Sequence, residues 1–245
     1  MKEEIKSLKI SFPRPLTKAI FVERPNRFIV HCRLANNDEV VVAHLPDPGR
    51  LTELLVAGTT VWLMDHDNPN RKTKWTAILC ENPTTNGLVS INTTFPNMLV
   101  EKGLREGFFQ EFEGWNFKKS EYTLGNSRWD FLMEKDESKQ LLLEVKSVTL
   151  AENGRGMFPD AVTARGAKHV RELAELARDS QFGTAVLFIA QRDDVRYITT
   201  ASHIDPKFDE ALREAEEAGV KLFARVCHIS VDGIEVGHPV PVILE

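Results

Sequence analysis

The order of hydrophobic and polar positions divides the chain into two parts. From residue 27 to residue 92, short runs rich in β-branched and aromatic residues are separated by clusters of Asn, Asp, Pro and Gly, and helical periodicity is nearly absent. This part predicts a hairpin and three further strands, at residues 27–34, 39–45, 59–64, 75–81 and 88–92. Five short strands favour a small closed β-barrel, with one short apolar helix at residues 51–55.

After residue 92 the pattern changes to strands separated by helices. The clearest helix is predicted at residues 160–178, where Ala167, Val170 and Leu173 share one face. Residues 184–190 are apolar throughout and predict a central strand. The other elements expected here are helices at residues 96–109 and 209–218 and strands at residues 121–124, 128–133, 140–146 and 220–228. This order indicates an α/β domain, so we expect two domains, at residues 1–96 and 97–245.

Composition places the chain among ordinary globular proteins. Of its 245 residues, 42% are hydrophobic and 27% are charged, which is close to the average for such proteins. The apolar runs are strand-length, and residues 1–6 mix both charges, so neither a membrane segment nor a signal peptide is expected. Cys32, Cys80 and Cys227 are far apart and form no CxxC pair, which predicts buried free thiols in the cytoplasm.

Charge is distributed unevenly between the two parts. The net charge is −5, but residues 1–96 carry 12 Lys and Arg against 10 Asp and Glu, which leaves the acidic excess in the remainder. The overall value argues against nonspecific coating of nucleic acid. It leaves room for a local basic groove.

The most informative stretch is Leu141-Leu142-Leu143-Glu144-Val145-Lys146, in which an apolar strand ends on Glu144 and Lys146. These two side chains lie two positions apart and so point to the same face of the strand. A carboxylate at the end of a buried strand needs a cation beside it, either a side chain or a metal ion. Asp130 lies in the preceding predicted strand and is placed to face Glu144 across a hairpin.

Two carboxylates and the Val145 backbone carbonyl form the oxygen environment that Mg²⁺ or Mn²⁺ prefers. Such an ion activates water and stabilises charge on an attacked phosphate, and Lys146 is suited to orient the water or neutralise the phosphate. The sequence therefore predicts phosphodiester hydrolysis by Asp130, Glu144 and Lys146. The competing interpretation is an alternating surface pair, Glu144 and Lys146, with Asp130 unrelated to it.

Basic residues near this stretch are candidates for contact with a phosphate backbone. Arg165 and Lys168 fall on the polar side of the helix predicted at residues 160–178, with Arg155 in the loop before it and Arg128 two positions before Asp130. A solvated helix face is the alternative explanation of such charges.

At these positions the sequence resembles the sugar fermentation stimulation protein A (SfsA) family. The stretches that carry the resemblance are Ser127 to Phe131, Glu144 to Leu150, and Phe158 to His169, and they occur in the family's order. Further similarity lies at Ala43 to Arg50 and in Ile91-Asn92-Thr93 with Pro96-Asn97. The likeness covers most of the chain.

The resemblance implies an N-terminal OB-like barrel, a restriction-endonuclease-like α/β/α domain of the PD-(D/E)xK type, and DNA binding, with a regulatory role in sugar (maltose) utilisation. It makes Asp130, Glu144 and Lys146 the metal and catalytic positions, with Glu121 as an additional carboxylate. Many members have Cys-Pro-Asn-Thr-Gly where this chain has Leu45-Pro46-Asp47-Pro48-Gly49. This departure puts a DNA contact by that loop in doubt.

OB barrels bind strands through basic groups that follow the backbone and aromatic rings on which bases stack. In the first domain these candidates are Arg50, Arg71, Lys72 and Lys74, with Trp62 and Trp75 as the rings. The alternative is that both tryptophans belong to the core.

Three functions follow as hypotheses. The first is a Mg²⁺-dependent nuclease acting on nucleic acid, with DNA favoured over RNA. The second is a DNA-binding regulator whose nuclease-like domain is idle. The third, an enzyme for a small phosphorylated sugar, lacks a Gly-rich phosphate loop. A homodimer is compatible with each.

Overall fold

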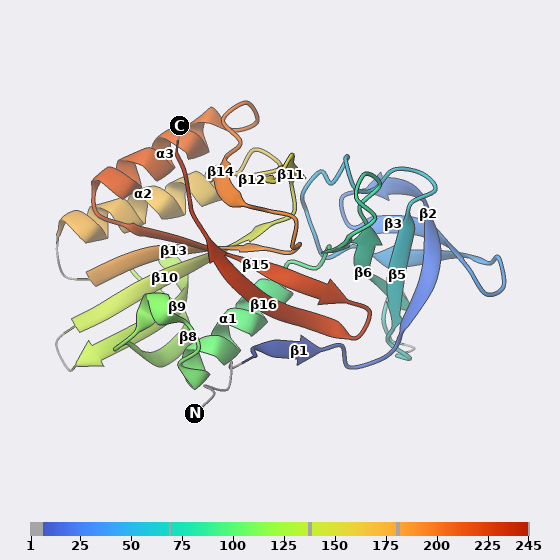
Figure 1. Cartoon of the computed structure of the whole chain (residues 1–245), viewed down its shortest axis with the longest axis horizontal. Coiled ribbons are helices and arrows are strands. Elements are labelled where there is room, and N and C mark those ends of the chain that lie inside the picture. The colour runs from blue at the N-terminus through green and yellow to red at the C-terminus, as the bar shows by residue number, and fades with distance from the viewer. Residues whose placement is uncertain (1–6, 69, 137–138, 180–181, 245) are drawn as a thin grey trace.

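The computed structural model describes residues 7–68, 70–136, 139–179 and 182–244. A β-barrel formed by the N-terminal part of the chain lies beside a larger α/β domain (Figure 1). Residues 1–6, where no signal peptide is expected, lie outside the described residues. Within the described residues, no helix is long and apolar enough to cross a membrane.

The sheet of the first domain closes on itself into a barrel. Its strand order is β4-β3-β2-β5-β6-β7, and a parallel pairing of β4 with β6 closes the ring. The strands are β2 (Leu16–Asn26), β3 (Ile29–Leu34), β4 (Val40–His44), β5 (Thr60–Asp65), β6 (Trp75–Glu81) and β7 (Leu88–Ser90). Alternate residues such as Ala19, Phe21, Val30 and Cys32 fill the interior.

The barrel differs from the prediction in three details. The strand β2 was not predicted, because Lys18, Glu23 and Arg24 interrupt its apolar positions, yet it supplies the fifth strand of the closed ring. The strand predicted at residues 88–92 only extends the sheet beyond β6. The predicted helix at residues 51–55 is a single turn, in which the N–H groups of residues 54 and 55 both donate to the Leu51 carbonyl.

The second domain is built on a seven-stranded mixed sheet in the order β1-β16-β15-β13-β10-β9-β8. Its strands are β1 (Lys9–Ser11), β8 (Asn116–Leu124), β9 (Ser127–Asp136), β10 (Lys139–Val148), β13 (Phe182–Ala190), β15 (Lys221–Ser230) and β16 (Gly233–Val240). The central strands β10, β13 and β15 run parallel. A small sheet of β11 (Ala151–Glu152), β12 (Arg155–Phe158) and β14 (Tyr197–Thr200) lies beside the barrel (Figure 1).

Helices cover both faces of the large sheet. The helix α1 (Phe95–Glu106) packs on one face, followed by the short helix η1 (Gln110–Phe112), while α2 (Ala164–Arg178) and α3 (Pro206–Glu217) pack on the other (Figure 1). Along β10, Leu141 and Leu143 contribute to the α1 core and Leu142 to the α2–α3 core. Because strand side chains alternate, this register directs Glu144 to the α2 face.

The helix predicted at residues 160–178 begins four residues later than expected. Thr163 is the N-cap, and its Oγ1 accepts a hydrogen bond from the Gly166 N–H at 3.1 Å. The cap stops the helix from extending toward Pro159. The three residues Asp160 to Val162 are therefore free to form a loop beside the barrel.

Hydrogen bonds join the two domains directly. The N–H of Ser90 donates to the Gln191 carbonyl at 2.9 Å, and the Ser90 hydroxyl contacts Gln191 Oε1 at 2.7 Å. In addition, β1 pairs with β16, so residues 9–11 belong to the sheet of the second domain although they precede the barrel. Cys32, Cys80 and Cys227 are free and buried, as predicted.

Candidate metal centre and active site

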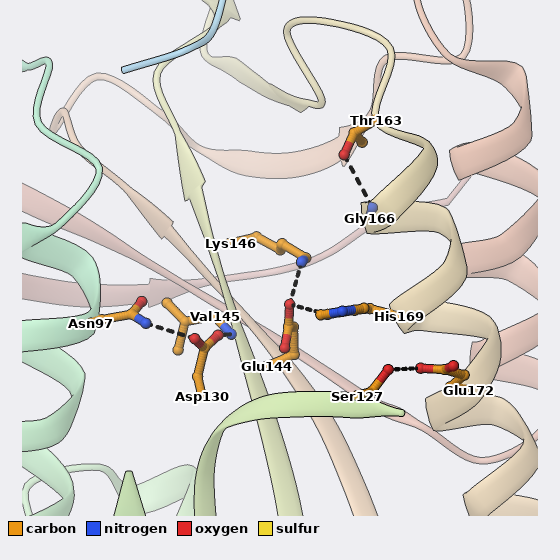
Figure 2. A network of polar contacts seen from close by, with 10 residues as sticks. All are labelled: Asn97, Ser127, Asp130, Glu144, Val145, Lys146, Thr163, Gly166, His169 and Glu172. Carbon is orange, nitrogen blue, oxygen red and sulfur yellow. Dashed lines mark hydrogen bonds and ion pairs between the residues drawn. The ribbon is translucent and has the colours of Figure 1, made fainter. Parts of the chain in front are cut away.

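Asp130 lies where the pairing of β9 with β10 ends. The antiparallel register runs as far as Leu143 opposite Phe131, and Asp130 is the next residue of β9. Its Oδ2 accepts a hydrogen bond from the Val145 N–H at 2.7 Å, and its Oδ1 accepts one from Asn97 Nδ2 at 2.7 Å. Asp130 is thus held between β10 and the first turn of α1 (Figure 2).

Glu144 is buried and is held through one of its two oxygens. Lys146 Nζ lies 2.6 Å from Glu144 Oε1, and His169 Nδ1 lies 3.1 Å from the same oxygen (Figure 2). Because an ionised carboxylate only accepts, both nitrogens are donors here. The side chain of Lys146 is 11% exposed and that of Glu144 is 7% exposed. The competing prediction of a solvated surface pair is therefore wrong.

The two carboxylates have different electrostatic surroundings. Burial, the largest cause, and the negative charge of Glu144, the second, raise the pKa of Asp130 to about 6. The hydrogen bond from the Val145 N–H acts in the opposite direction and lowers it. Burial alone would raise the pKa of Glu144 as well. The ammonium of Lys146 and the hydrogen bond from His169 outweigh burial and hold the pKa of Glu144 below its usual range.

The second oxygen of Glu144 supports a place for a cation. Glu144 Oε2 is buried and has no hydrogen-bond partner among the described residues. A buried carboxylate oxygen without a partner is costly, and a divalent cation with hard-oxygen preference would offset that cost. The same cation would oppose the raised pKa of Asp130. Among the described residues, the structure brings no three or more His, Cys, Asp and Glu side chains together in a group that could hold a metal. A cation at this place would therefore be held by the two carboxylates together with backbone or water oxygens.

Several predicted residues line the cavity that contains these carboxylates. This cavity measures about 230 Å³, and Glu121, Arg128 and Arg165 contribute to its wall. Glu121 is exposed and lies 3.5 Å from Arg128, at the edge of the site. Lys168 lines an adjoining hollow with Arg128 and Arg165.

Other predicted contacts lie elsewhere. Arg71, Lys72 and Lys74, in the connection from β5 to β6, do not line this cavity, and neither does Arg155, which lies 3.8 Å from Glu152. Arg50 lines a separate hollow together with Pro48 and Gly49, in the loop that follows β4. The two tryptophans pack against cores: Trp62 against the α1 core and Trp75 against the barrel core.

Two contacts of the carboxylates were not predicted, although His169 was considered as a group that assists at the phosphate or covers the helix surface. Asn97 binds Asp130 across 33 positions of sequence, so no local pattern reveals the contact. His169 is 6% exposed, with its ring centroid 5.5 Å from that of Trp129. Its position on the inner face of α2, one residue before Val170, was the available signal.

Comparison with known proteins identifies the family. Residues 22–91 match the SfsA N-terminal OB domain, and residues 94–233 match the sugar fermentation stimulation protein RE domain. The chain belongs to the sugar fermentation stimulation protein family. The predicted fold class, an OB-like barrel followed by a restriction-endonuclease-like α/β/α domain, is thereby confirmed.

Relatives align over nearly the whole chain. The sugar fermentation stimulation protein homolog of Shouchella clausii is 48% identical over 230 residues, which cover 94% of this chain and 98% of that protein. The homolog of Clostridium novyi is 42% identical over 226 residues, covering 92% and 96%. The structure of Pyrococcus furiosus SfsA in complex with Ca²⁺ is 29% identical, with a TM-score of 0.86 and coverage of 97% and 99%.

The family departure at Asp47 has an energetic consequence. Asp47 is 4% exposed, and its Oδ1 accepts a hydrogen bond from the Gly49 N–H at 2.8 Å. Burial, the largest cause, and the negative charge of Asp160, the second, raise the pKa of Asp47 to about 7. A carboxyl whose pKa is higher in the folded state destabilises that state once pH exceeds its unfolded pKa.

We expect Asp47→Asn to stabilise the protein at pH 8 by on the order of 2 kcal/mol, and to have little effect near pH 4. The gain should grow as pH rises from about 4 to about 7, because the amide keeps the acceptor for Gly49 and carries no charge. Thermal unfolding at both pH values measures it, with Asp38→Asn on an exposed turn as control. An Asp47→Asn variant less stable than wild type at pH 8 would contradict the raised pKa of Asp47.

Proposed function

We propose that this protein binds DNA and hydrolyses its phosphodiester bonds with Mg²⁺ or Mn²⁺. The observation that carries the proposal is Glu144, a buried carboxylate whose Oε1 is held by Lys146 and His169 while Oε2 has no partner. A cation bound there supplies Lewis-acid stabilisation of the attacked phosphate and lowers the pKa of bound water.

Each side chain of the site has a separate role in the proposed reaction. Asp130 and Glu144 hold the cation, with the Val145 carbonyl as the third predicted ligand and Glu121 as a further one at the edge. Asn97 and the Val145 N–H fix the orientation of the Asp130 carboxylate. Lys146 places a positive charge within reach of the attacked phosphate, which stabilises charge that develops there.

The choice of DNA rests on the charged rim and on the barrel. Arg128, Arg165 and Lys168 are exposed around the carboxylates, although the net charge of the chain is −5. OB barrels commonly bind nucleic-acid strands. The divalent cation is supported by the Pyrococcus furiosus relative, whose structure is described as a complex with Ca²⁺.

The test is cleavage of labelled single- and double-stranded DNA and RNA by the whole chain, with Mg²⁺, Mn²⁺ or EDTA. Cation-dependent cutting of DNA supports the proposal. Salt-sensitive DNA binding without cutting under any condition would instead favour a DNA-binding regulator of sugar utilisation with an idle site.

Cation binding should strengthen as pH rises through about 6. A proton on Asp130 competes with the cation, and with a pKa of about 6 only about a tenth of the carboxyl is ionised at pH 5. We therefore expect Mn²⁺ to bind about tenfold more weakly at pH 5 than at pH 7.5 in calorimetric titrations. Asp130→Asn should bind weakly at both, and equal wild-type affinities at the two pH values would rule out a role for Asp130.

A further inference from the structure

A second cavity lies between the barrel and the α/β domain. It measures about 370 Å³ and is lined on the barrel side by Arg27, Pro48 and Gly49. The opposite wall comes from the end of β10 and from the segment between β12 and α2. Its volume is in the lower part of the range of about 300–1,000 Å³ that is typical of small-molecule sites.

The interdomain cavity continues into the carboxylate site. Asn97, Val145, Lys146 and Thr163 line both this cavity and the smaller one that contains Asp130 and Glu144. Figure 2 shows Lys146 reaching from β10 toward Glu144, so its ammonium marks the junction of the two spaces. A phosphate near Lys146 would therefore have the interdomain cavity directly beside it.

The walls of the interdomain cavity combine flat apolar surface with polar groups. Pro48, Phe158, Pro159 and Val162 supply apolar area, and Val162 is 68% exposed. Ser147 and Thr149 supply hydroxyl groups, Arg27 a positive charge, and Asp47 and Asp160 carboxyl groups. Apolar faces for stacking, hydroxyl groups and a cation beside a phosphate site are what an unstacked nucleotide requires.

We propose that this cavity receives one unpaired nucleotide next to the phosphate that is cut, so that the substrate is single-stranded or locally unpaired DNA. The inference rests on the proposed function and adds its substrate class. A space of this size, walled on both sides by the two domains, admits one base with its sugar and excludes a base still stacked and paired in a duplex. Fully paired DNA must therefore open before it is cut.

The test measures binding and cleavage of one fluorescein-labelled DNA sequence in three forms: single strand, perfect duplex, and duplex with a central mismatch. Val162→Trp fills the mouth of the cavity with a larger side chain. Val162→Asp instead places a negative charge there, which repels a phosphate without filling the space. Val231→Trp, at an exposed turn between β15 and β16, is the matched control. Affinities come from fluorescence anisotropy with Ca²⁺, and cleavage rates from the same oligonucleotides with Mg²⁺ or Mn²⁺.

We expect the single strand and the mismatched duplex to bind at least about tenfold more tightly than the perfect duplex. Both Val162 variants should remove most of that preference, while Val231→Trp keeps it. Equal binding of all three forms, or wild-type preference in both Val162 variants, would overturn the inference. A preference that depends on Val162 without any cutting would support the cavity while defeating hydrolysis. Cutting of the single strand and the mismatched duplex at the wild-type rate by both Val162 variants would support hydrolysis while defeating the cavity.

Discussion

Glu144→Gln is expected to reduce cation-dependent DNA cleavage by about a thousandfold or more and to weaken Mn²⁺ binding. The amide matches the carboxylate in shape but has no negative charge for the cation. Its oxygen can still accept from Lys146 and His169 in place of Oε1, which leaves the NH2 group, a donor that cannot bind a cation, in place of Oε2. Cation catalysis supplies several kcal/mol, and about 4 kcal/mol corresponds to about a thousandfold in rate. Single-turnover cleavage and calorimetric titration measure the two effects.

The matched control is Glu134→Gln, because Glu134 is also a strand glutamate paired with a lysine, Lys118, but on the exposed side of β9. It should leave cleavage within about twofold of wild type, as expected for a surface substitution. Thermal unfolding of both variants checks that the fold persists. Wild-type cleavage by Glu144→Gln, with cation binding unchanged, would show that Glu144 is not a ligand.

Lys146→Met is expected to lower the cleavage rate by about a hundredfold or more without weakening cation binding. The loss of rate follows because a preorganised charge at the phosphate is worth about 10²–10³ in rate. Cation affinity should hold or rise at pH 7.5, because the substitution removes a positive charge 2.6 Å from Glu144 while the His169 hydrogen bond remains. This separation of rate from affinity distinguishes Lys146 from the two carboxylates.

Lys118→Met is the control for loss of a lysine, since Lys118 pairs with Glu134 at the surface. It should retain wild-type cleavage. A Lys146→Met protein that cuts DNA at the wild-type rate would leave Lys146 with a structural role only, as the counter-ion of a buried carboxylate.

Glu144 and Lys146 were predictable because the pattern that reveals them lies within one strand. The strand Leu141 to Lys146 shows its apolar run and its two charged residues within a single element, and strand periodicity alone puts Glu144 and Lys146 on one face. Asp130 needed one further assumption, a hairpin between neighbouring strands, and the structure pairs those strands as expected. The α2 helix was visible for the same reason, through its three- and four-residue spacing.

The remaining features depend on contacts between distant segments. Asn97 reaches Asp130 of β9 from the helix α1, and the interdomain cavity exists only after the loop at Pro48 meets the segment near Val162. The basic residues of the barrel show that a sequence does not give position, because Arg71 and its neighbours lie outside the cavity that holds the carboxylates, and their contact with nucleic acid stays a prediction. Charge is readable in a sequence, whereas its place on a folded surface depends on the packing of the two domains.

The central claim is that Asp130 and Glu144 form a cation-dependent site for phosphodiester hydrolysis. Its most direct test compares single-turnover cleavage of labelled DNA by wild type and by the double variant Asp130→Asn/Glu144→Gln, with Mn²⁺ or Mg²⁺ and with EDTA. Wild type should cut only with the cation, and the double variant should bind DNA but not cut it. Cutting by the double variant, cutting in EDTA, or no cutting by wild type with either cation would contradict the claim.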